Sequence, residues 1–146
     1  KEQRRIAKIL NFGVIYGLSP HGVARQTDLT RQQGKEFIDL YFGKYPGIKN
    51  YINEVLEFAK KNKYVETITG RRRILPEINS PNFQLRSSSE RMAINMPIQG
   101  SAADVVIAAM VKIFKNKRLM QMGWKMLLQI HDEVILEGPE ESADEA

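Results

Sequence analysis

Three consecutive residues near the end of the sequence, His131-Asp132-Glu133, could bind a divalent cation. They separate two apolar runs, residues 125–130 and 134–137, and this pattern predicts a β-hairpin with the three residues at its tip. A hairpin tip with adjacent carboxylates suits Mg²⁺, which binds one or two carboxylates together with substrate phosphates. The alternative is an acidic turn that is only solvated, because short motifs also occur by chance.

The first sixteen residues form a predicted helix and contain a second group of side chains that could bind a ligand. Arg4 and Lys8 lie one turn apart, Phe12 follows one turn later, and Tyr16 lies just beyond. Arginine and lysine donate hydrogen bonds to phosphate oxygens, and rings beside them can pack on a sugar and a base. This face therefore indicates nucleotide binding, although an amphipathic helix with a solvated basic face has the same spacing.

The elements that must hold these groups belong to a predicted α+β fold in which helices dominate. The apolar residues of the first helix, Ile6, Ala7, Leu10 and Val14, fall on one face and are expected to be buried. Gly17 is expected to end this helix, because glycine readily adopts the left-handed conformation found at helix ends.

The middle of the chain predicts two further helices and a small hairpin. Thr30 and Gln33 have the spacing of a capping box and mark the start of one helix. Pro46 suits the first turn of the next helix. Residues 64–76 read as a hairpin that turns at Gly70 and carries a basic second strand.

The second half of the chain predicts two more helices before the final hairpin. The first covers residues 86–96 and is expected to end at Pro97 and Gly100. The second covers residues 101–114 and is apolar on most of its surface, so it is expected to be buried. Asp104 is interpreted as an acid at the start of that helix and not as a catalytic group.

The charge of the sequence is unevenly distributed. Of 22 basic and 17 acidic residues, five acids and no base lie in residues 137–146, so residues 1–136 carry a net charge of +10. A basic body favours polyanions, nucleic acid first, over a merely soluble basic protein. The sequence has no cysteine, which excludes disulfides and thiolate zinc sites. We find no signal peptide and no apolar stretch of the roughly 20 residues that span a membrane.

Several segments together resemble the family A DNA polymerases of the bacterial DNA polymerase I type. Residues 4–17, RRIAKILNFGVIYG, resemble the family's fingers-helix motif, and His131-Asp132-Glu133 resembles its palm carboxylate motif. Residues 70–73, 90–97 and 99–104 also resemble family segments. The order is the same as in the family, and the resemblance covers essentially the whole chain.

The resemblance implies roles for the residues of the first helix. Arg4 and Lys8 would bind the phosphates of the incoming dNTP, and Lys8 would also donate a proton to the leaving pyrophosphate. Phe12 would pack on the sugar and base. Tyr16 would lie at the edge of the pocket and gate the templating base.

The resemblance further implies nucleotidyl transfer from a dNTP to a primer 3′ hydroxyl, with two Mg²⁺ ions that stabilise the attacking and leaving oxygens. Asp132 would be a catalytic metal ligand, and Glu133 would support it. Six other residues would contact the backbone or minor groove of the primer–template DNA: Arg73, Arg91, Asn95, Gln99, Gln129 and His131.

The implied architecture is part of a right-hand polymerase. Residues 1–75 would form helical fingers, and residues 76–146 would form part of a palm with an antiparallel sheet. The family's other palm motif, an Asp followed by Tyr-Ser-Gln-Ile-Glu, is not found in this sequence, nor are the thumb and the exonuclease-like domain. We therefore expect a piece of a larger enzyme of DNA replication and repair, with an incomplete two-metal site and no activity alone.

The expected partners are primer–template DNA, a dNTP and the missing palm and thumb portion, with no membrane. The expected location is the cytoplasm, at the nucleoid, if the source is bacterial; an organelle or phage origin stays open. Two alternatives remain: part of a single-subunit RNA polymerase, or a non-catalytic nucleic-acid-binding module. Phe12 within Asn11-Phe12-Gly13 and Glu133 after His-Asp favour the DNA enzyme, and the presence of Lys8 and Asp132 argues against a decayed module.

Overall fold

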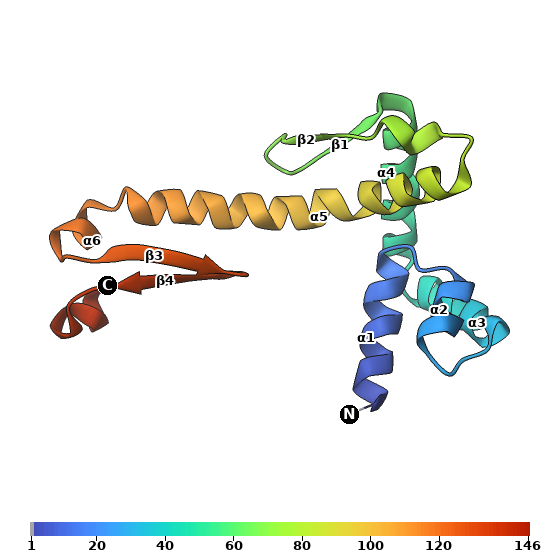
Figure 1. Ribbon diagram of the computed structural model, residues 1–146, viewed down its shortest axis with the longest axis horizontal. Coiled ribbons are helices and arrows are strands. Elements are labelled where there is room, and N and C mark those ends of the chain that lie inside the picture. Colours follow the sequence, from blue (N-terminus) through green and yellow to red (C-terminus); the bar gives the residue numbers. More distant parts are fainter. Residues whose placement is uncertain (1) are drawn as a thin grey trace. The chain divides into compact units, whose positions relative to one another are not determined.

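The computed structural model describes residues 2–146, and Lys1, which the first predicted helix included, lies outside them. The chain forms two compact units, one ending at Ile98 and the other running from Gln99 to Ala146. The α+β class is confirmed, since helices dominate and the described residues form two small antiparallel sheets (Figure 1). The boundary between fingers and palm at residues 75 and 76 stays a prediction.

The elements follow one another in this order: α1 Glu2–Ile15, α2 Pro20–Gln26, α3 Arg31–Lys44, α4 Pro46–Asn62, β1 Tyr64–Glu66, β2 Arg72–Ile74, a 3₁₀ helix Pro76–Asn79, α5 Phe83–Phe114, α6 Lys117–Gln121, β3 Lys125–Ile130, β4 Glu133–Glu137 and a 3₁₀ helix Glu140–Glu145.

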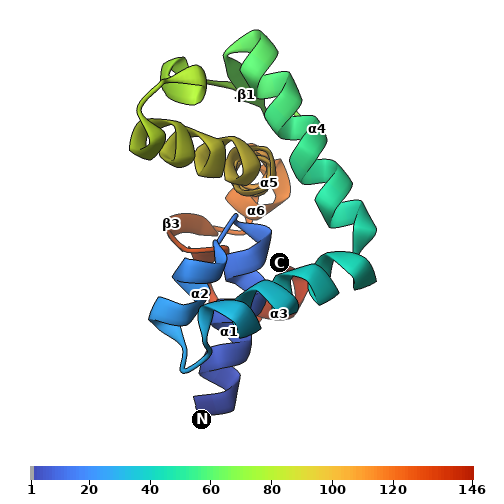
Figure 2. The same cartoon turned by 90° about the vertical axis from the view of Figure 1, so that its right-hand side faces the viewer.

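Capping side chains, a glycine and a proline mark where the first three helices begin or end. The helix α1 is followed by Gly17 at φ +80°, as expected from its sequence. The capping box that begins α3 is confirmed, because the Thr30 hydroxyl accepts from the Gln33 amide and the Gln33 side chain accepts from the Thr30 amide. The helix α2 was not expected; Ser19 caps it and Pro20 starts it. Figure 2 shows α2 beside α1 and α3, which it contacts.

The core of the first unit lies between α4, the β1–β2 hairpin and the first half of α5. The hairpin predicted at residues 64–76 is confirmed, with Val65 opposite Arg73 in the register of its two strands. Val65 is buried in a cluster with residues of the neighbouring helices, and Met92 packs against this cluster. Its buried members are Ala59, Val65, Leu75, Ile78, Ala93 and Met96.

The expected break at Pro97 and Gly100 is wrong, because α5 continues through both residues as one helix of 32 residues. Proline in a helix interior removes one backbone hydrogen bond and costs about 3 kcal/mol. Burial of Ala93, Ile94 and Met96 on the preceding turn offsets this cost. Since α5 does not begin again after Pro97, Asp104 is not a helix-start acid; it is a buried residue in the middle of the helix.

The expected burial of residues 101–114 is also wrong. Val105, Ile107 and Phe114 are 57%, 56% and 70% exposed, although the segment is apolar on most of its surface. Composition predicts burial only when a neighbouring element covers the helix, and the described residues provide little cover here. By length and composition α5 could also cross a membrane, a criterion that the core helices of soluble proteins meet as well.

The second unit contains the predicted hairpin of β3 and β4. Ile130 pairs with Glu133, so only His131 and Asp132 lie in the connecting turn. A register shift at Leu127 marks a β-bulge in β3. The loop after β4 packs tightly on Trp124, since a β-carbon at Gly138 would overlap the indole ring.

The Tyr51 hydroxyl on α4 donates a 2.9 Å hydrogen bond to the carbonyl of Ile94 on α5, close to Pro97. Burial raises the pKa of Tyr51 above 10.0, which keeps the hydroxyl protonated as a donor. Tyr51→Phe should lower the free energy of unfolding by about 1 kcal/mol, measured by thermal unfolding of the chain.

The matched control is Tyr45→Phe, because Tyr45 is 45% exposed and has a ring contact with Tyr41 that the variant keeps. This control should change stability by less than about 0.5 kcal/mol. The destabilisation by Tyr51→Phe should be constant below pH 10.0 and shrink above it, because the folded state favours the protonated hydroxyl. Equal effects of the two variants would contradict the assigned hydrogen bond.

Candidate functional site

The helix α1 presents Arg4, Lys8 and Phe12 at steps of one turn, and we refer to these residues as the α1 strip. All three are exposed, Phe12 by 56%. Among the side chains of residues 3–146, which the structure describes, no acid pairs with Arg4 or Lys8, so neither cation has to leave one of these acids to accept an anion. Successive residues of the strip lie about 6 Å apart along the helix axis. Such a strip can bind phosphates at one end and an aromatic or sugar surface at the other.

The opposite side of α1 fixes the strip to the rest of the first unit. Leu10 and Val14 are buried, as predicted, whereas Ala7 is exposed. The half-buried Tyr16 directly follows the helix, and its amide donates to the carbonyl of Phe12. A rigid helix with one buried face therefore holds the exposed cations.

The end of α1 lies against α5. A β-carbon at Gly17 would be 3.6 Å from Ile94 Cδ1 and 3.8 Å from Arg91 Cγ, which is ordinary packing distance. A cavity of about 250 Å³ opens beside them, lined by residues of α1, α3, α4 and α5 that include Val14 and Glu90. The fold thus brings Gly17, which directly follows Tyr16, next to Arg91. Tyr16 and Arg91, which belong to different predicted groups, are 75 positions apart in the sequence.

The predicted DNA contacts of the first unit meet on α5. Arg73 of β2 reaches the helix, where its Nη2 atom donates to Met92 Sδ at 3.0 Å. Arg91 is the neighbour of Met92, and its Nη1 atom donates to the Ser87 hydroxyl at 3.1 Å. Asn95 lies one turn further along, so Arg73, Arg91 and Asn95 belong to one region of the first unit.

Asn95 has a buried acceptor without a partner. Its Oδ1 atom is the buried side-chain oxygen that lacks a hydrogen bond among the described residues. Leaving such an atom unpaired costs about 1–3 kcal/mol. A water molecule or ligand that donates a hydrogen bond could pair with this oxygen, which belongs to the turn of α5 after Arg91.

The second unit carries the acidic part of the predicted site. His131, Asp132 and Glu133 are exposed at the tip of the β3–β4 hairpin. His131 adopts φ +56°, an uncommon conformation for a residue other than glycine. The Gln129 side chain donates to the His131 carbonyl and so supports the turn. Sequence reasoning missed this role, which is visible only once the strand has turned back on itself.

Asp132 and Glu133 offer oxygen ligands of the kind that Mg²⁺ prefers. Within residues 2–146, no three histidine, cysteine or acidic side chains are grouped so that they could hold a metal ion. The hairpin tip therefore fits one side of a magnesium site.

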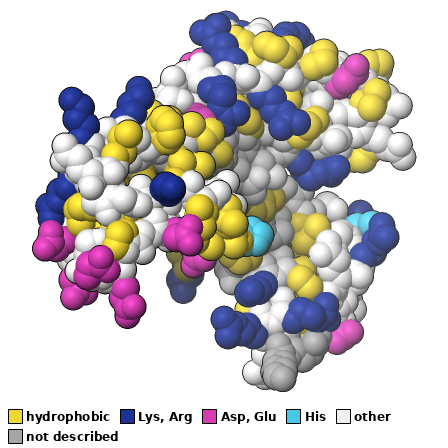
Figure 3. All heavy atoms as spheres, turned by 60° about the vertical axis from the view of Figure 1, so that its left-hand side comes forward, with side chains coloured by type: hydrophobic (Ala, Val, Ile, Leu, Met, Phe, Trp, Pro, Cys, Tyr) yellow, Lys and Arg dark blue, Asp and Glu magenta, His cyan; other side chains and the backbone are white. Residues whose placement is uncertain are grey.

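The predicted residues are divided between the two units. Arg4, Lys8, Phe12, Tyr16, Arg73, Arg91 and Asn95 lie in the first unit, and Gln99, Gln129, His131, Asp132 and Glu133 lie in the second. Gln99 is exposed on α5, one turn after Asn95. Figure 3 shows lysine and arginine side chains at many separate points of the surface, and several acidic side chains close together in one part of it.

Known proteins are similar to this sequence along most of its length. Residues 1–146 match DNA polymerase family A. DNA polymerase I of Geobacillus stearothermophilus is 46% identical over 141 residues, which are 97% of this chain and 16% of that protein. DNA polymerase I of Streptococcus pneumoniae serotype 4 is 51% identical over 138 residues, which are 93% of this chain and 16% of that protein.

The fold also matches a solved polymerase structure. The POL domain of Pol1 from M. smegmatis, in complex with DNA primer-template and dNTP, is similar with a TM-score of 0.91 at 39% identity. The match covers 99% of this chain and 25% of that one. The chain thus spans about one sixth of the curated relatives it matches and a quarter of the POL domain. Sequence and structure agree across the described residues, and the chain belongs to DNA polymerase family A.

Proposed function

We propose that this chain provides the dNTP-binding helix, part of the primer–template surface and one carboxylate limb of the metal site of a DNA-directed DNA polymerase. The observation that carries the proposal is the α1 strip. Two cations that pair with no acid among residues 3–146 and an exposed ring follow one another there, on a helix held by its buried face. The similar M. smegmatis domain was solved with DNA primer-template and dNTP, and this supports both ligands here.

The nucleotide would lie along the α1 strip. Arg4 and Lys8 suit the phosphates, with Arg4 as a fork of donors and Lys8 as a point charge. Phe12 would pack on the sugar and base, and Tyr16 would border the pocket. In this arrangement the developing negative charge on the leaving pyrophosphate falls near Lys8, which can also supply it with a proton.

The primer–template duplex would follow the region of Arg73, Arg91 and Asn95. The two arginines match a phosphate backbone. The unpaired Asn95 Oδ1 atom is buried and can accept a hydrogen bond from an ordered water that links it to the DNA. In the second unit, Gln99, Gln129 and His131 are further candidates for this surface. Gln129 would act there in part through the turn that it supports.

Asp132 would bind Mg²⁺, with Glu133 beside it. In two-metal nucleotidyl transfer the ions stabilise the attacking and leaving oxygens of an in-line displacement. The chain's own part is to hold the two carboxylates on a short, hydrogen-bonded turn. Two adjacent carboxylates supply one side of such a centre, so we propose that this chain alone is inactive and needs the remaining palm and thumb.

Two other functions were open from the sequence. The named relatives are DNA polymerases, which supports DNA synthesis over RNA synthesis. A ribonucleotide incorporation assay on an intact polymerase that carries this segment separates these two. A non-catalytic nucleic-acid-binding module would keep DNA binding while losing metal-dependent extension, and the substitutions below separate it from an enzyme.

In an intact family A polymerase that carries this segment, Lys8→Ala should slow the chemical step. The expected loss is about 2 kcal/mol or more, roughly 30-fold in the single-turnover rate, because a charge next to the leaving group acts mainly in the transition state. Lys35→Ala removes an equally exposed lysine from α3 and should leave the rate unchanged. An unchanged chemical step in Lys8→Ala would make Lys8 a surface cation only.

The 146-residue chain by itself should not extend a labelled primer with Mg²⁺ and all four dNTPs. A separately made fragment that supplies the rest of the polymerase should restore extension if the two parts associate. Asp132→Ala should abolish this restored activity, whereas Asp144→Ala, an exposed acid outside the hairpin, should not. Mg²⁺-dependent synthesis by the chain alone would refute the proposed incomplete site.

A further inference from the structure

The three consecutive arginines of the β1–β2 hairpin do not have equivalent surroundings. Side chains of neighbouring strand residues point to opposite faces, so Arg72 and Arg73 face different parts of the molecule. We propose that Arg72 is not a DNA ligand but a positioning residue, which forms a clamp with Glu66 and Tyr64 and thereby holds Arg73 on α5 for DNA binding. This inference rests on the proposed function.

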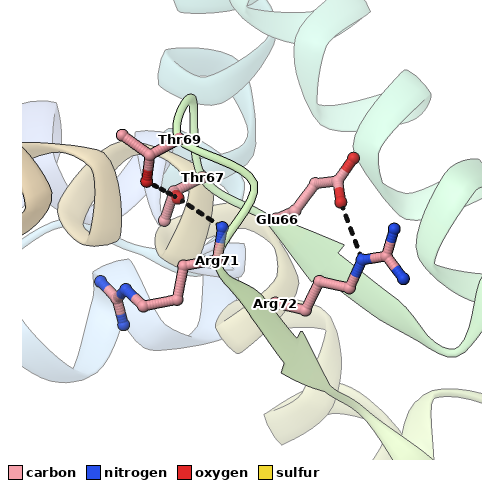
Figure 4. A network of polar contacts seen from close by, with 5 residues as sticks. All are labelled: Glu66, Thr67, Thr69, Arg71 and Arg72. Atoms are coloured by element: carbon pink, nitrogen blue, oxygen red, sulfur yellow. Dashed lines mark hydrogen bonds and ion pairs between the residues drawn. The ribbon is translucent and has the colours of Figure 1, made fainter.

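The clamp lies on the outer face of the hairpin. Arg72 Nε donates to Glu66 Oε2 at 3.1 Å, and the two residues are cross-strand partners (Figure 4). The Arg72 guanidinium carbon lies 4.5 Å from the centre of the Tyr64 ring. That ring stands edge-on to Phe58 of α4, with 5.5 Å between the ring centres. Arg72 is thus occupied by a carboxylate and an aromatic face that is itself packed on a helix.

Arg73 has a different environment on the inner face. Its cross-strand partner is Val65, which is 1% exposed and part of the core cluster. Its guanidinium donates to Met92 Sδ on α5. A thioether is a weak acceptor and carries no charge, and no acid whose side chain is described, in residues 3–146, pairs with Arg73. The contact therefore holds the guanidinium at Met92 on α5, while its charge stays available for an anion.

The core cluster anchors the hairpin through Val65, and the clamp adds a local restraint between its two short strands. Each strand has three residues, and hairpins of this kind are marginally stable in isolation. At the turn, the Arg71 amide donates to the Thr67 hydroxyl at 3.1 Å, and the Thr67 and Thr69 hydroxyls are 3.0 Å apart (Figure 4). The clamp joins the two strands directly through the Arg72–Glu66 side chains, and its loss would let the Arg73 backbone move.

Charge and position predict opposite effects of one substitution, which makes the clamp testable. Glu66→Gln removes a negative charge from a surface that binds DNA, so simple electrostatics predicts tighter binding. If the clamp positions Arg73, the same substitution weakens binding. Arg72→Lys keeps the charge but loses the planar fork; it should behave like Arg72→Gln, whereas a direct phosphate contact would be largely kept by lysine.

The experiment uses an intact family A polymerase that carries this segment and measures primer–template binding by fluorescence anisotropy. Arg73→Ala should weaken binding on the order of tenfold. Glu66→Gln, Arg72→Gln and Arg72→Lys should each weaken it by at least about twofold. In the Arg73→Ala background the three substitutions should have no further effect, because they act through Arg73. Lys35→Gln serves as the charge control on α3, and unchanged melting temperatures check the fold of each variant.

Three results would overturn the clamp. The first is tighter DNA binding by Glu66→Gln, and the second is a further loss of binding when Arg72→Gln is added to Arg73→Ala. The third is that Arg73→Ala binds DNA as tightly as the wild-type enzyme, while the wild-type enzyme binds and extends DNA. Failure of the proposed function is distinct, because the wild-type enzyme itself would then neither bind primer–template nor extend it.

Discussion

The first unit depends on the burial of a small apolar cluster between α4, the β1–β2 hairpin and the first half of α5. Val65, Leu75 and Ile78 are almost completely buried there. Truncation of a large core side chain typically costs about 2–5 kcal/mol. Because Arg73 extends from this hairpin, and Arg91 and Asn95 extend from this helix, the same cluster fixes the backbones that present the proposed DNA contacts. Packing and recognition therefore depend on one set of contacts.

The chemical groups of the chain sit on regular elements and very short turns. The α1 strip is exposed because its helix buries the opposite face through Leu10 and Val14. The carboxylates at the hairpin tip are held by a two-residue turn that Gln129 supports. Functional groups on rigid supports lose little freedom when a ligand binds. This arrangement suits a polymerase, in which each incoming nucleotide must meet the same geometry.

Residues of one type have different tasks according to their strand face. Arg72 and Arg73 are neighbours with the same charge, yet one is paired with Glu66 and the other lies on the sulfur of Met92. Net charge alone would assign both to nucleic acid. Strand alternation separates a cation that is internally compensated from one that remains available to a ligand.

Residues close together in the sequence predict the helix ends, the hairpin tip and the family correctly. The capping box of Thr30, the helix end at Gly17 and the hairpin around His131-Asp132-Glu133 follow from nearby residues, and the ordered motifs identified family A. The continuation of α5 through Pro97 depends on packing between distant segments, since contacts with α4 offset the local cost of the proline. The exposure of residues 101–114 and the position of Gly17 beside Arg91 also depend on the tertiary structure. Burial and contacts depend on which elements pack together in the folded chain. The pattern of apolar residues along the sequence indicates only which residues could be buried.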